Sequence, residues 1–534
     1  MKIGILVKNL TQLSNWQYRI IEGICKDSEM EAEILLEEGA FRDWRWTNTG
    51  NDIAICPKIS GLSGVLLKMQ YAIETRWLFK PPQVAHTYKS SDFFKEIKVV
   101  KLGKENLEPK DLLLNLDRVS VTDALLNMSK NGVWEMLFKD KVLEQDGPVG
   151  FWEIIKKKPV VTATLINFKT NLKAYAVVGK AHFNRHWSMS ETATIVSEGS
   201  VSLLFKNLDS LKKGTLQFTD NTMPVKNSVH TPTFFSTLKY VGEFYGGFGN
   251  KLYEKTMAKL TKRRYECWTV FTGNDGFFQN ITSSAFALPM PKDEFWADPF
   301  LFHYKGTDYL FFENYSYVTK RGKISCGILN KGQLTNVVDV LDTGYHLSFP
   351  FIFEEGGDIF LMPEGSENRT LEIYRAIDFP LQWENYTTAF KGEAVGDAFF
   401  HTDKDRQQWL FLNKQAAPTS PMNSELFIYQ VDSVKLNTLI PHKQNPVLID
   451  ASVARNGGAI FMHDGEYYRP SQRNTDGVYG RALNINKIEK LTLEEYKETT
   501  VQVIEPDFEK NLMGLHHLHH CNGTFVFDAA YRYK

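Results

Sequence analysis

The chain has 534 residues, and its 62 lysines and arginines nearly balance its 63 aspartates and glutamates, so the formal net charge is −1. This balance excludes the overall basic field of a protein whose main partner is nucleic acid or an anionic membrane. Single hydrophobic cores stop growing near about 250–300 residues, so the length predicts more than one domain. Aromatic residues make up 13% of the chain, which favours β-rich structure and sugar-binding surfaces.

The sequence predicts neither a leader peptide nor a membrane-spanning segment. Polar residues interrupt the first ten positions early, unlike the apolar centre of a signal peptide. No stretch approaches the roughly 18–20 apolar residues that cross a bilayer. The five cysteines are scattered and match no metal-binding spacing. We therefore expect a reduced, cytoplasmic protein, and we predict no metal and no cofactor.

Residues 1–205 alternate short apolar runs with segments of helical spacing. Lys2–Val7, Leu112–Leu116 and Val160–Ile166 have the composition of buried strands, and Trp16–Ile24 follows the first with a helical pattern. This alternation predicts a layered α/β domain. Ligands of such sheets bind beyond the carboxyl ends of the strands. Asp117 and Arg118, directly after the second run, stand where a residue of that crevice would lie.

Residues 206–265 are predicted to form a linker that contains an amphipathic helix. The segment ends in a basic run, Lys259–Arg264. Such a run suits peripheral contact with a membrane surface or with phosphates. The alternative is a solvated helix end, where cations complement the helix dipole.

From residue 266 onward the pattern is β, and it repeats five times. The repeats begin at Pro299, Pro350, Ala398, Gly458 and His516, and each has an aromatic strand, a turn and a second strand. Third strands follow in the first three repeats. Intervals of 48 to 60 residues suffice for one four-stranded blade each. The sequence therefore predicts a five-bladed β-propeller over residues 266–534, so the fold class is multidomain, α/β followed by all-β.

The innermost strands of such a propeller carry the candidate site residues. Asp298 lies on the first and Asp397 on the third, while Phe349 takes the place of Asp298 on the second. The second strands of the first two blades end at identical offsets with Glu313 and Glu364.

These residues carry a resemblance to known families. The Ala-Asp-Pro-Phe entry at Ala297–Phe300 resembles that of the furanosidase superfamily of five-bladed propellers. The whole run from Trp296 to Tyr531 is similar to the propeller-like N-terminal domain of plant glucosamine inositolphosphorylceramide transferase. The shared segments are Phe295–Phe300, Pro350–Phe353, Pro363–Asn368, Tyr374–Ala376, Phe379–Pro380, Trp383, Arg455–Gly458 and Tyr468–Gln472.

The hydrolases of the furanosidase superfamily use a carboxylate base or nucleophile, a second aspartate and a glutamic acid that donates a proton. The resemblance implies that Asp298 is the base, that Glu364 or Glu367 is the acid, and that Asp397 orients the sugar or tunes a pKa. Phe349 departs from the pattern, which puts hydrolysis in doubt. The structural alternatives are a turn acceptor for Asp298 and an ion pair with Arg369 or Arg375 for Glu364.

Several polar and aromatic residues near the predicted axis suit sugar, carboxylate or phosphate recognition. The candidates for substrate binding are Trp296, Arg455, Asn456, Arg469, Gln472, His516 and His517. The alternatives are packing in the core for the tryptophan and pairing between blades for the arginines. The histidines between 516 and 520 alternate between strand faces, so they predict no metal site.

Residues 1–205 also resemble the formyltransferase fold of methionyl-tRNA and sugar N-formyltransferases, which implies a Rossmann-like domain. The resemblance rests on Gly132–Asp140, Asp146–Ile155 and Pro159–Leu165. Catalysis in that family uses an Asn-x-His pair, and Gly132 and Trp134 stand at those positions. We therefore expect no folate and no formyl transfer by this route, with His182 and His186 as the remaining substitutes for the missing histidine.

The leading hypothesis is a carbohydrate-active transferase of surface-glycan or glycolipid biosynthesis, with the sugar at the propeller axis. Its partners would be a nucleotide sugar or sugar phosphate and a glycan or glycolipid acceptor, with no nucleic acid. The alternatives are a furanosidase-type glycoside hydrolase, a non-catalytic sugar-binding scaffold and a sugar N-formyltransferase.

Overall fold

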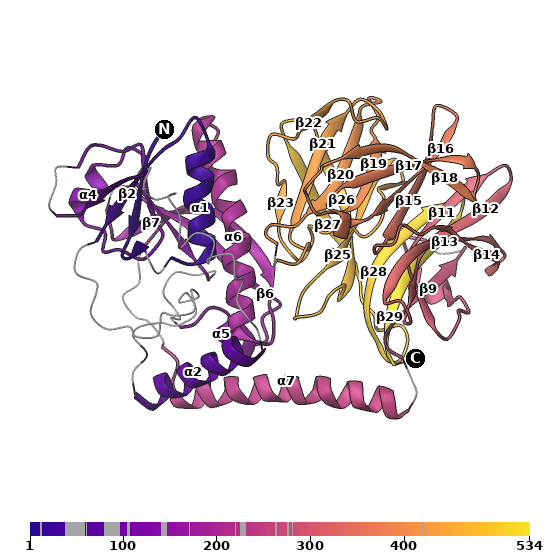
Figure 1. The fold of residues 1–534 in the computed structure, drawn as a ribbon, viewed down its shortest axis with the longest axis horizontal. Coiled ribbons are helices and arrows are strands. Elements are labelled where there is room, and N and C mark those ends of the chain that lie inside the picture. The colour runs from indigo at the N-terminus through magenta and orange to yellow at the C-terminus, as the bar shows by residue number, and fades with distance from the viewer. Residues whose placement is uncertain are drawn as a thin grey trace. The chain divides into compact units, whose positions relative to one another are not determined.

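The structure is a computed structural model of the chain (Figure 1). It describes residues 1–10, 13–37, 59, 61–78, 97–103, 107–139, 147–169, 171–218, 220–224, 231–261, 264–274, 277–279, 281–418 and 420–533. The chain forms two compact units. One comprises residues 1–248 with 416–420, and the other comprises residues 249–415 with 421–534. The domain boundaries expected from the sequence, 1–205, 206–265 and 266–534, stay a prediction.

The first unit contains a mixed sheet of eight strands in the order β3-β2-β1-β4-β5-β6-β7-β8. Its parallel part has β1 (Lys2–Val7), β2 (Glu31–Leu36), β3 (Lys98–Lys101), β4 (Leu112–Asn115) and β5 (Val133–Leu137). The antiparallel part has β6 (Val160–Phe168), β7 (Ala174–Asn184) and β8 (Asp220–Pro224). The three apolar runs predicted as strands are β1, β4 and β6. The formyltransferase-type arrangement stays a prediction, because a mixed sheet of this kind does not establish it.

Helices accompany this sheet. They are α1 (Asn15–Lys26), α2 (Gly61–Ile73), the π-helical turn η3 (Glu74–Leu78), α4 (Asp123–Asn127), α5 (Phe151–Ile155), α6 (Met189–Lys212) and α7 (Phe234–Leu260). Helix α1 begins with a capping box between Ser14 and Gln17 and buries Trp16 and Ile20. It approaches α6 closely, since a Cβ on Gly23 would lie 2.3 Å from the Phe205 ring. Within the described residues, no helix combines the length and hydropathy needed to cross a membrane.

The second unit is a β-propeller, and the five blades predicted from the repeats are confirmed in the described part of the chain. Blade 1 has β11 (Glu294–Tyr304), β12 (Thr307–Ser316), β13 (Arg321–Asn330) and β14 (Gln333–Leu341). Blade 2 has β15 (Ser348–Glu355), β16 (Asp358–Glu364), β17 (Leu371–Asp378) and β18 (Gln382–Ala389). Blade 3 has β19 (Val395–Thr402), β20 (Gln408–Lys414), β21 (Glu425–Val431) and β22 (Leu439–Pro441), with β23 (Leu448–Ile449) beside β21. Blade 4 has β24 (Phe461–His463), β25 (Glu466–Arg473), β26 (Ala482–Leu491) and β27 (Tyr496–Ile504).

Blade 5 joins the two ends of the propeller sequence. Its inner strands are β28 (Leu512–Cys521) and β29 (Thr524–Tyr533), and its outer strands are β9 (Tyr265–Gly273) and β10 (Phe286–Ala287), which precede blade 1 (Figure 1). The rings of Phe271 on β9 and Phe527 on β29 stack with centroids 5.1 Å apart at 3°. This closure, which the repeat pattern did not predict, joins both ends of the propeller in one sheet.

The innermost strands share one irregularity that positions the site. The pairing of each with its neighbour shifts register after Ala297, Ser348, Gly396 and Leu515 in blades 1, 2, 3 and 5. In three of these bulges the next residue has a left-handed backbone, at φ of 51° for Asp298, 44° for Phe349 and 48° for Asp397. A β-bulge re-aims a side chain and interrupts pairing. Such strained residues concentrate at functional sites.

Replacing Phe271 by alanine should destabilise the propeller by about 3–5 kcal/mol, the range for a fully buried phenylalanine. The ring is buried where β9 joins β29, so its loss weakens the closure itself. Urea unfolding followed by tryptophan fluorescence measures this change. The control is Phe286→Ala on β10 of the same blade, whose ring is 49% exposed and whose loss should cost under about 1 kcal/mol. Equal losses in the two variants would contradict a closure that depends on the β9–β29 pairing.

Candidate active site at the propeller axis

The bulged inner strands and their neighbours bring a group of ionisable side chains together. We call this group the axial cluster. It consists of Asp298, Glu313, Glu364, Asp397, Arg455, Tyr479, His516 and Asp528. Its carboxyl groups are buried or nearly so, whereas the Tyr479 side chain is 44% exposed. Buried charges require paired partners, and this cluster has two cationic groups that supply them.

Arg455 joins the carboxylates of blades 2 and 3. Its Nε lies 2.5 Å from Asp397 Oδ2, and its Nη2 lies 3.3 Å from Asp397 Oδ1 and 3.4 Å from Glu364 Oε2. Burial opposes the charge of the guanidinium, but Asp397 and Glu364 outweigh it and raise the pKa of Arg455. The absence of a side chain at Gly396 is required here, because a Cβ would lie 2.6 Å from Glu364 Oε2.

His516 joins the carboxylates of blades 1 and 5. Its Nδ1 lies 2.6 Å from Asp528 Oδ1, and its Nε2 lies 3.5 Å from Asp298 Oδ1. Burial lowers the pKa of His516, but the charges of Asp528 and Asp298 raise it above its ordinary value. The ring stacks on Trp268, with centroids 3.9 Å apart. The two carboxylates therefore favour the charged form of the imidazole.

Asp298 is the carboxylate best held in its ionised form. Burial opposes its charge, but His516, His517 and Arg455 together place the pKa of Asp298 below its usual range. Its Oδ2 also accepts the backbone N–H of Phe349 at 3.2 Å. Hydrogen bonds and nearby cations both favour the charged carboxylate.

Glu313 has the opposite environment. Burial raises the pKa of Glu313 well above its ordinary value, and the negative charges of Asp298, Glu364 and Asp528 raise it further. Its nearest described basic neighbour is His346, whose Nε2 lies 3.6 Å from Glu313 Oε1. The surroundings of Glu313 therefore favour its protonated form, whereas those of Asp298 favour the ionised form.

The contrast follows from how the blades are joined. In blades 1 to 3, one residue of the second strand pairs with the inner-strand residue that precedes the bulge. These pairs are Glu313 with Ala297, Glu364 with Ser348, and Asn413 with Gly396. Glu364 and Asn413 accept backbone N–H groups of the next blade, from Asp397 at 3.3 Å and from Asn456 at 2.9 Å. In blade 1 the corresponding N–H, that of Phe349, is bound by Asp298 instead. Among the described residues, Glu313 thus accepts no backbone N–H that would favour its charged form.

Three atoms of the cluster lie close enough to hold a cation. One ligand atom each from Asp298, His516 and Asp528 lies within 4.8 Å of the others. The sequence predicted no metal here. Asp528 Oδ1 already accepts the backbone N–H groups of His516 and His517, at 3.2 and 3.0 Å, besides contacting the imidazole. These bonds account for the arrangement as a carboxylate–histidine pair, and the absence of a metal stays a prediction.

Of the two glutamates predicted as acids, only Glu364 lies in the axial cluster. Glu364 belongs to the cluster, where its partner is Arg455 and neither of the arginines suggested by the sequence. Glu367 lies exposed on the 3₁₀ turn η5 (Ser366–Asn368), and its Oε2 accepts the backbone N–H of His346 at 3.1 Å. Glu364 and Glu367 therefore differ in burial and in partners, and Glu313 fits the role of acid better than either.

Most of the predicted substrate-binding residues are buried in the framework. Trp296 is 4% exposed and packs on Phe312 at 4.6 Å, which corresponds to the core alternative. Arg469 is fully buried, with Nη2 2.5 Å from Glu498 Oε1. Asn456 donates to the backbone oxygen of Asp397 at 2.9 Å. Their contacts are to protein groups, so any contact with substrate stays a prediction.

Two further predicted residues, Gln472 and His517, are buried and contact members of the axial cluster. The buried Gln472 donates its backbone N–H to the Arg455 carbonyl at 2.8 Å. His517 is fully buried, and its Nδ1 lies 3.5 Å from Asp298 Oδ1. Its ring contacts Phe300 and Phe349 edge to face. Both residues thus hold the groups that line the site.

Sequence reasoning missed Asp528 and Tyr479 as members of the site. Asp528 is a lone carboxylate in the apolar β29 run, which is a usable signal because a charge buried in a strand needs partners. The ring centroids of Tyr479 and Trp268 lie 6.5 Å apart, and both rings contact His516. Nothing local distinguishes them from the other aromatic residues.

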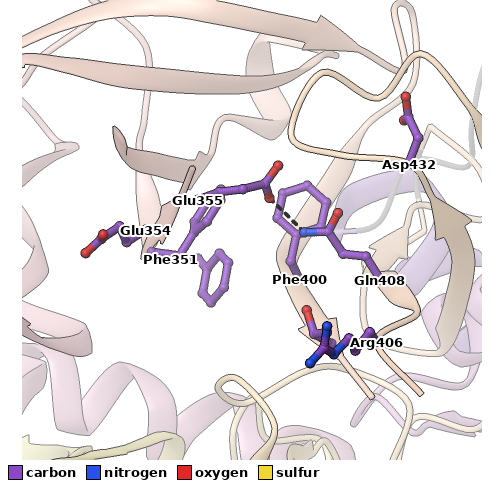
Figure 2. Close-up of a pocket in the computed structure, with 9 residues that line it drawn as sticks. Phe351, Glu354, Glu355, Phe400, Arg406, Gln408 and Asp432 are labelled. Carbon is purple, nitrogen blue, oxygen red and sulfur yellow. Dashed lines mark hydrogen bonds between the residues drawn. The ribbon is translucent and has the colours of Figure 1, made fainter. Parts of the chain in front are cut away.

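A cavity of about 410 Å³ lies elsewhere on the propeller. It is lined by Phe351, Phe353, Glu354, Glu355, Phe400, Thr402, Arg406, Gln408 and Asp432. Figure 2 shows Gln408 Nε2 donating to Glu355 Oε2, at 2.8 Å. None of these lining residues belongs to the axial cluster.

The first unit has a smaller polar group at the carboxyl ends of its parallel strands, where the sequence placed Asp117. Asp117 Oδ2 accepts the Lys8 backbone N–H at 2.8 Å, and burial raises the pKa of Asp117 and of Glu135. Arg118 is exposed, with a left-handed backbone at φ 48°. The group fits the expected crevice but shows no ligand chemistry of its own.

The residues weighed for formyl transfer serve other contacts. Trp134 is buried and Gly132 has a φ of 86°. His182 Nδ1 lies 3.0 Å from Thr162 Oγ1, and His186 Nδ1 accepts the Ser188 backbone N–H at 3.1 Å. No feature of the described residues supports a proton relay for formyl transfer.

Replacing Arg469 by methionine should destabilise the propeller by about 3–5 kcal/mol, because it leaves the buried Glu498 charge without its cationic partner. The matched control is the double variant Arg469→Met/Glu498→Leu, which removes both charges and should recover most of the loss. Denaturant unfolding of the three proteins measures these energies. A small loss of stability in Arg469→Met would instead favour a role for Arg469 in substrate binding.

Replacing Glu313 by glutamine should stabilise the propeller at neutral pH. A raised pKa means that the folded state binds more protons than the unfolded state, so stability falls as the pH rises above the unfolded value of about 4.3. The glutamine variant lacks this loss, so its advantage should grow from pH 4 to pH 8. Unfolding measured across that range tests the sign, with Glu367→Gln as the exposed control. If the advantage of Glu313→Gln over wild type instead shrank as the pH rose, that result would contradict a raised pKa for Glu313.

The comparisons with known proteins concern the propeller. A family model described as the N-terminal part of glucosamine inositolphosphorylceramide transferase 1 matches residues 279–523, less than half of the chain. Glucosamine inositolphosphorylceramide transferase 1 of Arabidopsis thaliana is 34% identical over 265 residues, covering 49% of this chain and 33% of the relative. The protein of that name from Oryza sativa subsp. japonica is 37% identical over 233 residues, covering 42% and 31%. The chain thus spans about a third of the length of these relatives.

Solved structures resemble the same part of the chain more distantly. A thermostable family-43 glycoside hydrolase has a TM-score of 0.35 and 11% identity, covering 46% of this chain and 90% of that one. A family-43 β-xylosidase/α-arabinofuranosidase from a compost microbial metagenome has a TM-score of 0.34 and 14% identity, covering 45% and 87%. Similarity at this level carries no conclusion. The sequence matches therefore show that the propeller is similar to the N-terminal region of glucosamine inositolphosphorylceramide transferase 1.

Proposed function

We propose that this protein is a carbohydrate-active transferase that moves a sugar onto a glycolipid or glycan acceptor, with the sugar bound at the axial cluster. The observation that carries the proposal is that two buried carboxyl groups of one cluster have opposite environments, which lower the pKa of Asp298 and raise that of Glu313. Pairs of carboxyl groups whose environments separate their pKa values are the acid and base of glycosyl chemistry. The matched relatives, which are named as transferases, support the same class.

In this proposal Glu313 is the acid and Asp298 the base. Glu313 gives its proton to the leaving oxygen as the bond from that oxygen to the anomeric carbon breaks. Asp298 accepts the proton of the acceptor hydroxyl, whose oxygen forms the new bond to the anomeric carbon. Each transferred proton is accounted for, and the pair ends in the reverse protonation state, which exchange with solvent restores.

The surrounding groups have chemistry that suits a sugar. Trp268 and the partly exposed Tyr479 present aromatic faces beside His516, and aromatic faces bind the apolar sides of sugar rings. Arg455 and His516 offset part of the negative charge of the cluster, and a neutral sugar adds no further charge to it. The donor would be a nucleotide sugar or sugar phosphate, and a cytoplasmic location, where such donors are made, is part of the proposal.

A furanosidase-type hydrolase is the second candidate, favoured by the same two carboxyl groups, since water can replace the acceptor hydroxyl. It predicts release of reducing sugar from aryl furanosides without any acceptor. A non-catalytic sugar-binding scaffold would bind sugars without turnover. Formyl transfer stays a prediction without support from the residues of the first unit.

The test combines binding and transfer. Purified full-length protein is screened by thermal shift against nucleotide sugars and sugar phosphates. Donors that bind are then tested with radiolabel for transfer to glycolipid acceptors. Asp298→Asn and Glu313→Gln should each lower the transfer rate by about 10²–10⁴-fold, the usual contribution of a general acid or base. Glu367→Gln, outside the cluster, should leave it unchanged.

The pH profile separates the two roles. The rate should fall on the alkaline side as Glu313 loses its proton, and Glu313→Gln should abolish that limb. Thermal stabilisation by sugars without turnover would overturn the transferase in favour of the scaffold, and turnover without an acceptor would favour the hydrolase.

A further inference from the structure

Two helical segments of the first unit expose large apolar side chains on one face each. On α2, Leu62, Val65 and Met69 are 64%, 53% and 59% exposed. They follow one another at intervals of three and four residues, so they share one face of the helix. The turn η3 continues directly from α2 and exposes Trp77 at 79% and Leu78 at 41%.

Helix α7 repeats this pattern over its first half. Phe235, Leu238 and Tyr245 are 80%, 45% and 46% exposed. The exposed Gly242 fills the position between the last two, so these residues lie at intervals of three and four along a single face. Phe248, three residues after Tyr245, is 42% exposed. Isolated exposed apolar residues are ordinary, but a row of aromatic and aliphatic side chains marks an interaction surface.

The two segments pack against each other, and their contacts fix which faces remain exposed (Figure 1). Ser63 Oγ lies 3.0 Å from Thr237 Oγ1, and Tyr240 donates its hydroxyl hydrogen to Glu74 Oε1 at 2.5 Å. Glu74 Oε2 also accepts from Ser188 at 2.6 Å. All these side chains are buried. The polar contacts therefore occupy the inner faces and leave the apolar rows turned outward.

The charges of these segments are asymmetric. In the parts of these segments that belong to the first unit, residues 61–78 and 234–248, three cationic residues accompany two glutamates. Both glutamates have partners: Glu74 in the buried contacts above, and Glu243 with Lys157 at 3.8 Å. Arg76 and Lys239 are exposed. The surface is therefore apolar along its rows and basic beside them.

We propose that the outer faces of α2, η3 and α7 bind the surface of a lipid bilayer that contains anionic lipids. The inference rests on the proposed function in one respect, since a glycolipid acceptor would lie in such a bilayer. Helices that lie in a membrane interface combine an apolar face with tryptophan, tyrosine and flanking lysine or arginine. Lysine and arginine extend their charges to headgroups while their stems cover apolar surface.

The test uses the full-length protein and sedimentation with phosphatidylcholine vesicles, with and without phosphatidylserine. Wild type should bind the anionic vesicles, and added salt should weaken the binding because it screens the lysines. Trp77→Ser/Phe235→Ser should lower the vesicle-bound fraction by at least about tenfold, since two large apolar side chains are lost from the interface. Arg76→Glu/Lys239→Glu should remove the preference for phosphatidylserine.

Val318→Ser is the matched control, because Val318 is also 80% exposed but lies on blade 1 of the propeller. It should bind vesicles like wild type. Vesicle binding that is absent, or equal in wild type and Trp77→Ser/Phe235→Ser, overturns the inference. So does a wild-type dimer in sedimentation equilibrium that this variant converts to monomer, since the faces would then join two copies.

The outcome is independent of the proposed function. Asp298→Asn should bind vesicles like wild type, because the axial cluster does not contact the lipid. Trp77→Ser/Phe235→Ser should keep full transfer to a water-soluble acceptor and lose it only for acceptors in vesicles. Vesicle binding without sugar transfer would leave the inference standing and remove the transferase.

Discussion

The interior of the propeller holds several acidic side chains, and it can do so because a cation lies among them. The Nε of Arg455 lies 2.5 Å from Oδ2 of the buried Asp397. Removing ions from water costs several kcal/mol each, and only close partners offset that cost. Arg455 does this in part for blades 2 and 3, where burial still raises the pKa of Asp397 well above its ordinary value, and His516 does it for blades 1 and 5. Without these two cations the remaining carboxylates would take up protons, and the acid–base difference in the cluster would vanish.

The same carboxylates also hold the blades together. Asp528 accepts the backbone N–H of Asp298, Asp298 accepts that of Phe349, and Glu364 accepts that of Asp397. Each bond joins one blade to a bulged residue of the next, and each requires a charged or acceptor oxygen. Protonating these groups would therefore loosen the junctions as well as change the chemistry. Glu313 is the exception, since Asp298 occupies the N–H that it would otherwise accept. Its freedom from that structural role is what leaves it suited to carry a proton.

The sequence predicted the blades well and the site only in part, for physical reasons. A hairpin is a local pattern, so the strand, turn and strand of each repeat were visible in the residues themselves. The closure of blade 5 pairs Phe271 with Phe527, and no local pattern links segments so far apart. Strand alternation places Trp296 and Asp298 on one face. The bulge between Ala297 and Phe300 breaks that alternation, so the indole lies in the core and the carboxylate in the cluster. Glu364 and Glu367 likewise could not be ranked without knowing where β16 ends.

A balanced net charge excluded a strong overall field but not a local one. Electrostatic attraction to a surface decays within about 10 Å at moderate salt, so only the charges near the contact matter. On α2, η3 and α7 the glutamates are engaged by partners, whereas Arg76 and Lys239 are exposed beside Trp77 and Phe235. The arrangement depends on Glu74, whose buried bonds to Tyr240 and Ser188 orient both helices. A carboxylate inside the unit thus decides which side chains a membrane can reach, as Asp298 decides which carboxyl group can carry a proton at the axis.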